Sequence, residues 1–255
     1  MIVNFDGVDG YIGLPDAAAL RPTGAFTLEL WARPTAAAIT TGYTGKGCLT
    51  NFGSNRGVMI FPSSTYGWVF VIGNGFTYYF RGGGTPVADT WAHLALAWSG
   101  SQIYFVVDGA PVDTTNQWSQ GTAQWEIGRR TLSSNANCWD GDVSDVRLWN
   151  IYRSAATIAA QKDARLTGAE SGLVGYWRLD DGSGSSAADS KGSNDGNLYG
   201  GATWSSDAAP AGDSSLTMFP DALVLTPTLP VPQYDPHPVY PPALALTPTL
   251  PVPTA

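Results

Sequence analysis

Short apolar segments with a two-residue period, separated by tight-turn dipeptides, constrain the fold of this chain more than any other feature. Residues 26–31 (FTLELW) and 102–107 (QIYFVV) alternate in this way, and residues 91–98 (WAHLALAW) form a nearly continuous apolar run. The dipeptide Asp108-Gly109 after the second segment is a typical hairpin turn. A period of two fits strands rather than helices, because strand side chains alternate between the two faces of a sheet. We therefore expect an all-β fold.

Two later segments, residues 143–149 and 172–179, predict further strands, and one helix is expected between them. Ser154 stands where its side chain can cap an alanine-rich segment, residues 155–162. That segment ends in Lys162, and a basic residue is favourable in the last turn of a helix. The sequence thus predicts an antiparallel sandwich with one short helix.

The charge balance excludes some partners. The formal net charge is −8, and no basic cluster occurs, which argues against nucleic-acid binding. No apolar run approaches the roughly 18 residues needed to cross a bilayer, so membrane insertion is not expected. Met1 leads directly into a strand-like segment without a secretory leader. Cys48 and Cys138 leave two alternatives open, one disulfide or two buried thiols.

The composition changes near Ala208, where proline becomes frequent. Residues 222–232 and 243–253 are two copies of an eleven-residue repeat that differ only at Val224 and Ala245. Proline at this density excludes a helix interior and removes ladder donors, so an extended arm is expected. We therefore divide the chain into a sandwich, residues 1–207, and an arm, residues 208–255. The apolar residues that alternate along the arm are Leu223, Leu225, Leu229, Val231, Leu244, Leu246, Leu250 and Val252.

Several motifs of the first part resemble the laminin-G-like and pentraxin-like jelly-roll family, which has a concanavalin-A-like sandwich. They are VNFDG at residues 3–7, WAHLA at 91–95, YFVVDG at 104–109 and WDGDVSDVRLWN at 139–150. Residues 173–204 resemble a segment that usually precedes the first of these motifs but follows them here. We expect this segment to close the same sandwich in permuted order; a truncated second module is the alternative.

The resemblance includes retaining glycosidases, which use two carboxyl groups about 5–5.5 Å apart. The nearest segment here runs from Asp140 to Asp145 and contains no glutamate, and Asp140-Gly141-Asp142 reads as a turn. His93 lies in an apolar strand, where the family usually keeps a structural histidine. No enzymatic activity is therefore expected.

A structural calcium ion is the cofactor that the resemblance implies. Asp189 and Asn194 match a loop that often holds calcium in the family, and Asp145 matches the acidic position of another motif. Calcium prefers six to eight oxygen ligands, which such a loop can supply. Turn formation is the alternative role for these residues.

Sugar binding is the other common property of the family, and exposed aromatic rings would carry it. Tyr78 and Tyr79 are successive strand residues, so at most one of them lines a groove. The candidate residues for glycan binding are Tyr66, Trp68, Tyr78, Tyr79, Trp118 and Trp139.

Two functions remain open. The first is a structural assembly subunit, for example a capsid decoration or fibre-associated protein at a virion surface. Its arm would dock on like subunits, for instance around a threefold axis, or on a larger particle. The second is an extracellular lectin-like adhesion module in which the arm is a spacer. Loosely, the tail resembles those of some bacteriophage structural proteins, which favours the first.

Overall fold

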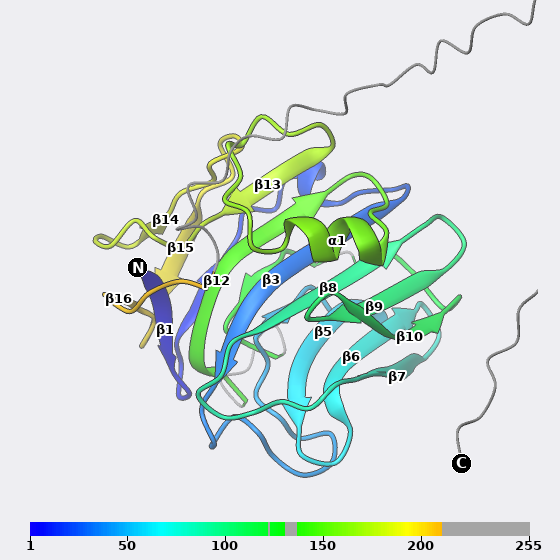
Figure 1. The fold of residues 1–255 in the computed structure, drawn as a ribbon, viewed down its shortest axis with the longest axis horizontal. Helices are drawn as coiled ribbons and strands as arrows, with labels where there is room; N and C mark the ends of the chain where they lie inside the picture. Colours follow the sequence, from blue (N-terminus) through cyan, green and yellow to red (C-terminus); the bar gives the residue numbers. More distant parts are fainter. Residues whose placement is uncertain (122, 131–136, 211–255) are drawn as a thin grey trace, which may run out of the picture. The chain divides into compact units, whose positions relative to one another are not determined.

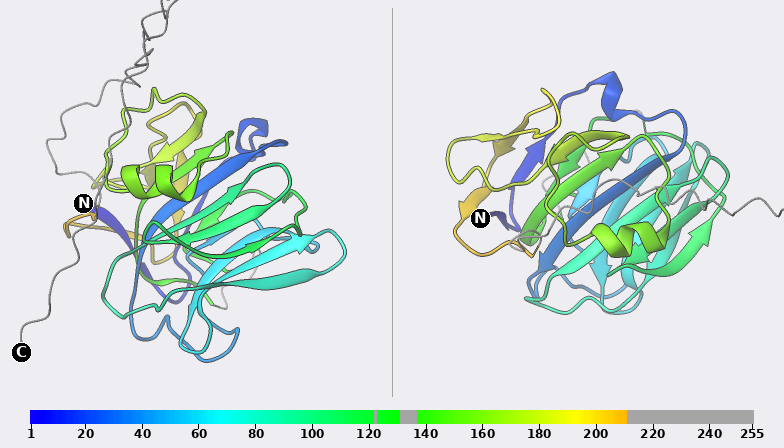
Figure 2. Two further views of the ribbon diagram at one scale, coloured as in Figure 1. Left: turned by 45° about the vertical axis from the view of Figure 1, so that its right-hand side comes forward. Right: turned by 45° about the horizontal axis from the view of Figure 1, so that its top comes forward.

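The structure, a computed structural model, describes residues 1–121, 123–130 and 137–210. Its strands form two antiparallel sheets packed face to face, with one short helix on the outer side of the first sheet (Figures 1 and 2). This arrangement confirms the predicted all-β sandwich with a single helix. Of the arm, residues 208–255, only 208–210 are described, so the predictions for its repeat and its alternating apolar residues lie outside the described residues.

The first sheet has the strand order β10-β9-β8-β3-β12-β1-β16, and β13 also pairs with β12. Its long central strands are β3 and β12, which pair antiparallel. The strands of this sheet are β1 (Ile2–Asp6), β3 (Phe26–Pro34), β8 (Ala92–Trp98), β9 (Ile103–Val107), β10 (Ala110–Thr115), β12 (Asp140–Trp149), β13 (Leu173–Trp177) and β16 (Thr203–Ser205).

The second sheet has the order β14-β15-β2-β11-β4-β5-β6-β7, so that β7 is an edge strand. A 3₁₀ turn, η1 (Ala18–Leu20), follows β2. The strands of this sheet are β2 (Tyr11–Gly13), β4 (Leu49–Thr50), β5 (Arg56–Ser63), β6 (Gly67–Asn74), β7 (Tyr78–Gly83), β11 (Glu126–Ile127), β14 (Ser186–Ala187) and β15 (Gly196–Tyr199).

The main core lies between the sheets and follows the alternation of the strands. In β6, Trp68, Phe70 and Ile72 face this core, whereas Val69 and Val71 belong to a separate cluster on the outer face of the second sheet. Each large apolar side chain that is fully buried contributes about 1.5–3 kcal/mol to folding. The core therefore determines which face of each strand remains for contacts with other molecules.

Strand β12 corrects one expectation. The sequence predicts a turn at Asp140-Gly141-Asp142, but these residues pair with β1 and β3 inside the first sheet. Gly141 continues the strand at a φ of +142°, which glycine tolerates better than other residues. Farther along, the register shifts between Ser144 and Arg147.

The segment after the helix supplies strands to both sheets. Its first strand, β13, pairs with β12, and β15 pairs with β2. The last strand, β16, pairs with β1, so that Ile2 lies opposite Ser205. The final strand of the sandwich is thus hydrogen-bonded to its first strand.

Helix α1 (Ala155–Gln161) begins as predicted, because the Ser154 hydroxyl accepts a hydrogen bond from the Thr157 backbone N–H at 3.2 Å. Its one buried residue, Ile158, packs against Ala95, Ala97 and Val106 on the outer face of the first sheet. Within the described ranges, no helix has the length and apolar character to span a bilayer.

The two cysteines are free thiols, which decides between the alternatives that the sequence leaves open. Gly47 forms a bridge with Cys138, so the next residue, Cys48, points to the opposite side. Accordingly, Cys48 belongs to the main core, whereas the charges that act on the Cys138 thiol come from Arg129, Lys46 and nearby aspartates.

Candidate functional site

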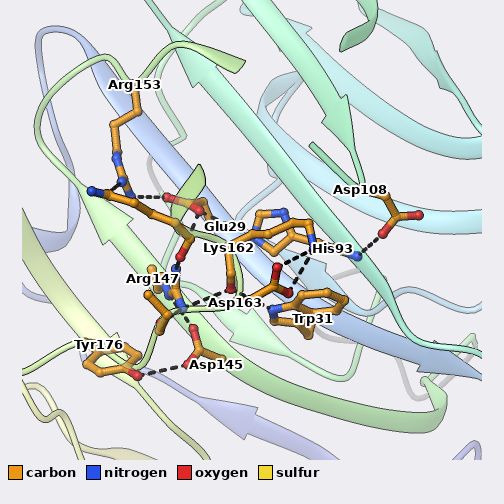
Figure 3. Close-up of polar contacts among 12 residues, drawn as sticks. Glu29, Trp31, His93, Asp108, Asp145, Arg147, Arg153, Lys162, Asp163 and Tyr176 are labelled. Atoms are coloured by element: carbon orange, nitrogen blue, oxygen red, sulfur yellow. Dashed lines mark hydrogen bonds and ion pairs between the residues drawn. The ribbon is translucent and has the colours of Figure 1, made fainter. Parts of the chain in front are cut away.

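A network of buried charges lies on the outer side of the first sheet, under α1 and the segment that follows it (Figure 3). Glu29 is at its centre: Arg153 Nη1 lies 2.6 Å from Glu29 Oε1, and His93 Nε2 lies 3.4 Å from Glu29 Oε2. Arg147 Nη1 is 3.8 Å from the same Oε2 and also pairs with Asp145. All five side chains are almost completely buried, so this network holds the fold together rather than receiving a ligand.

Arg147 also ties the end of α1 to the sheet. Its guanidinium donates to the backbone carbonyls of Gln161 at 3.0 Å, Lys162 at 3.3 Å and Ala164 at 2.6 Å. These carbonyls lie at and just beyond the C-terminal end of α1, where a cation is favourable. The network is therefore the anchor of α1.

The three calcium candidates do not form one oxygen-lined site. Asp189 Oδ1 accepts hydrogen bonds from the backbone N–H groups of Tyr176 and Lys191, each at 2.9 Å, and its Oδ2 accepts two from Asn194 at 3.2 Å. Asp145 contacts Tyr176 at its ring hydroxyl, 2.9 Å away, whereas Asp189 contacts the backbone of that residue. In the described chain, no group of three or more His, Cys, Asp or Glu residues is placed to hold a metal ion. The N–H groups that donate to Asp189 fit a role in fixing the conformation of this loop better than they fit calcium coordination.

The acidic residues of β12 are also engaged. Asp140 Oδ2 lies 3.2 Å from Lys46 Nζ, and Asp142 Oδ2 lies 2.7 Å from Arg33 Nε. Asp145 is paired with Arg147. Retaining glycosidases need two carboxyl groups close together and available to the substrate. Each of these three aspartates is instead paired with a basic side chain.

The structure contradicts the prediction that Trp68 and Trp139 bind glycans, because both side chains are buried. The side chains of Trp68 and Trp139 are 0% exposed, and their ring centroids lie 6.4 Å apart in the main core. Neither ring can stack on a sugar. Trp118 is partly buried and packs against Phe26 and Trp98, so it covers the core.

Tyr78 and Tyr66 are exposed and belong to one surface feature, which we call the aromatic stripe. Tyr43 lies between Tyr66 and Phe80, with ring centroids 4.4 Å and 3.7 Å away and nearly parallel planes. Phe80 meets Tyr78 edge to face at 5.6 Å, and Tyr78 meets Phe52 in the same way at 5.9 Å. The stripe consists of Tyr66, Tyr43, Phe80, Tyr78 and Phe52, and two of these residues, Tyr78 and Phe80, lie on the edge strand β7.

A pocket of about 160 Å³ opens beside the stripe, and we call it the tyrosine pocket. Its volume is close to that of a cavity that holds one six-membered ring, about 150 Å³. Because two rings already flank Tyr43, Tyr66 is the one that offers a free face; it is 48% exposed. The pocket is lined by Tyr43, Tyr66, Val69, Phe80, Arg81, Gly82 and Asp113.

Hydrogen-bonding groups border the pocket. Asp113 is held in place because its Oδ2 accepts the Gly82 N–H at 3.1 Å and its Oδ1 accepts the Thr114 N–H at 2.7 Å. Arg81 pairs with the core residue Phe70, so its side chain lies on the core-facing side of β7, where its Nε is buried without a hydrogen-bond partner. Partial burial, and then the neighbouring Tyr66, raise the pKa of Tyr43, so its phenol stays protonated at neutral pH. The pocket thus combines apolar ring surface with both donors and acceptors.

Sequence reasoning found Tyr66 and Tyr78 but missed Tyr43, Phe80, Arg81 and Asp113. The two-residue spacing of Tyr78 and Phe80 was a usable signal, since both fall on one face of a strand. Tyr43 lies between strands, where no periodicity marks it.

A laminin G family model, described as the concanavalin A-like lectin/glucanases superfamily, matches residues 6–159. No curated protein matches the chain in sequence. One similar solved structure is a candidate carbohydrate-binding protein from Bacteroides ovatus, with a TM-score of 0.61 and 18% identity. The match covers 79% of this chain and 58% of that one, so this chain spans little more than half the length of that relative. At this identity the likeness shows the fold alone.

Two further structures show weaker likeness. Domain 4 of an extracellular arabinanase from Geobacillus stearothermophilus, in complex with arabinotriose, has a TM-score of 0.49 and 14% identity and covers 62% of this chain and 74% of that one. The heptameric SAP-like pentraxin from Limulus polyphemus has a TM-score of 0.41 and 16% identity and covers 61% and 82%.

Proposed function

Because this chain belongs to the laminin G-like family of the concanavalin A-like lectin/glucanases superfamily, we propose that its sandwich is a non-enzymatic module that binds carbohydrate at the tyrosine pocket. One observation carries the proposal: an exposed stack of aromatic rings borders a pocket the size of one sugar ring, with Asp113 at its edge. Binding sites of small molecules combine apolar walls with a few placed polar groups in this way.

The chemistry of a sugar matches these groups. The C–H face of a pyranose or furanose ring is apolar and stacks on an aromatic ring, while each hydroxyl can both donate and accept. Tyr66 would provide the stacking face, the Tyr43 hydroxyl a donor and Asp113 the acceptor. The described lining of the pocket holds one carboxylate, whereas glycoside hydrolysis ordinarily uses two. Binding without cleavage is therefore the function that this geometry supports.

The test is binding of the full chain to an array of immobilised neutral and acidic oligosaccharides. Tyr66→Ala removes the free stacking face and is expected to weaken binding about tenfold or more. Tyr199→Ala is the matched control, because Tyr199 is 46% exposed and also stacks on a tyrosine, Tyr11, at 4.8 Å. Equal binding by the two variants would show that sugars do not use this pocket.

The sequence repeat favours a second candidate function, assembly on a particle such as a virion surface. Residues 222–232 and 243–253 repeat an alternating leucine pattern, which a solvated spacer does not require. A full chain with Leu223, Leu225, Leu244 and Leu246 changed to serine tests this idea. Light scattering is expected to show a defined oligomer for the native chain and a smaller mass for the variant. Monomers in both cases would exclude self-assembly through these leucines.

A further inference from the structure

Strand β7 is the last strand of the second sheet, so one side of it has no neighbouring strand of that sheet (Figure 1). The register with β6 identifies the backbone groups that face this open side. The Asn74 N–H donates to the Thr77 carbonyl at 3.0 Å, and from this pair onward hydrogen-bonded and non-hydrogen-bonded pairs alternate along the antiparallel ladder. The N–H and C=O groups of Tyr78, Phe80 and Gly82 therefore point to the open side.

The two ends of this open side differ. At one end, the Gly82 N–H donates to Asp113 Oδ2 at 3.1 Å, so a side chain of β10 already occupies it. At the other end, the N–H and C=O groups of Tyr78 and Phe80 have no hydrogen-bond partner within the described residues. A strand edge with free backbone groups is a template for pairing with an extended segment of another chain.

The side chains next to these free groups are aromatic. Phe80 lies opposite Val71 and packs on the apolar cluster of the outer face, and Tyr78, on the same side of the strand, is 48% exposed. In the turn before β7, Phe76 is 91% exposed. Exposed apolar side chains that gather in one place mark an interaction surface. A segment that pairs with this edge would thus gain contacts with the rings as well as backbone hydrogen bonds.

The repeat in the arm contains two segments with matching properties. Residues 222–226 (ALVLT) and 243–247 (ALALT) lack proline, so each keeps the N–H groups that strand pairing needs. Pro227 and Pro248 follow directly and would end the pairing there. Each segment has five residues and β7 has six. The leucines alternate, so in an extended segment both would lie on one face.

We propose that the open edge of β7 binds one of these segments from the arm of another molecule of this chain, as an added antiparallel strand. The inference rests on the second candidate function, assembly through the arm, and names the surface that receives it. The two leucines would lie opposite Tyr78 and Phe80, exchange backbone hydrogen bonds with them and extend the row of rings. Because each chain carries two segments and one β7, a segment is always left for a neighbouring molecule.

The first experiment tests the backbone pairing with a fluorescent peptide of residues 221–232, measured by anisotropy. Its receptor is the full chain with the four leucine-to-serine changes given above, so that the receptor's own arm does not compete. We expect the peptide to bind, and N-methylation at Leu223 and Leu225 to weaken it at least about tenfold, because two hydrogen bonds are lost. The matched control is N-methylation at Val224 and Thr226, whose N–H groups would point away from β7; it should leave the affinity unchanged.

The second experiment measures the mass of the full chain by light scattering. Tyr78→Ser is expected to weaken association at least about tenfold, seen as a smaller mass at equal concentration. Tyr199→Ser is the matched control, because Tyr199 is 46% exposed but lies on β15, away from this edge; it should keep the native mass. If Tyr78→Ser does not fold, the peptide experiment decides the proposal.

Three results would overturn the proposal. They are no binding of the peptide at millimolar concentration, equal binding of the two methylated peptides, and a native mass for Tyr78→Ser. If the leucine-to-serine chain is nevertheless smaller than the native oligomer, the arm assembles the protein on a different surface, and the assembly function survives. If the native chain is itself a monomer, the assembly function fails, and the proposal fails with it.

Discussion

Replacing Glu29 by glutamine tests whether the buried network stabilises the sandwich. The carboxylate is 0% exposed and faces Arg153, Arg147 and His93, with the closest contact at 2.6 Å. Glutamine keeps the size of the side chain and can still accept a hydrogen bond, but it removes the negative charge. Arg153 would then lose its carboxylate partner and keep its contacts with Gln161 and the Trp149 ring, while Arg147 would retain Asp145.

Loss of one partner from a buried ion pair costs about 3–5 kcal/mol, because the remaining charge is left buried without compensation. In a domain of this size, 1 kcal/mol lowers the melting temperature by about 2–4 °C, so Glu29→Gln is expected to lower it by about 6–20 °C. Asp163→Asn is the control, since Asp163 is 56% exposed and its pair with Lys162 contributes at most about 1 kcal/mol.

The effect also depends on pH in a defined direction. Burial by itself would raise the pKa of Glu29, but the contacts with His93, Arg153 and Arg147 outweigh it and lower the pKa below the usual 4.5. A lowered pKa in the folded state stabilises the protein above the unfolded value, and this stabilisation is lost as the pH falls through the folded value. The stability gap between wild type and Glu29→Gln should therefore be full at neutral pH and shrink below about pH 4.5. Urea unfolding between pH 3 and 7 measures it; a gap below about 1 kcal/mol at pH 7 would refute the reasoning.

Three further predictions follow from the fold. Gly141→Ala should destabilise the sandwich by about 2 kcal/mol or more in urea unfolding, because its φ is +142° and the new Cβ would lie 2.2 Å from the Arg33 carbonyl; Gly24→Ala, in open space, should be neutral. The melting temperature should be the same in millimolar calcium and in EDTA, because N–H donors already occupy Asp189; a rise with calcium would restore the calcium hypothesis. Both thiols should react with a disulfide reagent only after unfolding, since Cys48 and Cys138 are 0% exposed and burial raises their pKa; reaction in the native state would contradict this.

The fold could be predicted from the sequence because the alternation of the strands and the capping signal of the helix indicate the same architecture. Strand β3 shows the two-residue alternation, and its core-facing residues Phe26, Leu28 and Leu30 are the ones that the alternation selects. The start of α1 was predictable because a serine cap acts locally, within three residues of Ser154.

The site was less predictable because exposure depends on which face a strand turns inward. Residues 68–72 (WVFVI) are apolar on both faces, since one side enters the main core and the other carries the outer cluster. Nothing in this run therefore distinguishes a buried Trp68 from an exposed one. The register shift in β12 has a similar effect at Asp145, because a bulge changes the alternation that sequence reasoning assumes.

The pairing of β1 with β12 and β16 also has consequences for how the protein is made. Val3 lies opposite Val143 and Trp204, so the first strand must wait for residues about 140 and 200 positions later. At a synthesis rate of about 5–20 residues per second, β16 follows β1 out of the ribosome by roughly 10–40 s. During that time an apolar strand edge is without its partners and open to other chains. This sandwich should therefore fold slowly and after synthesis rather than during it, and its yield in cells should depend on chaperones that cover β1.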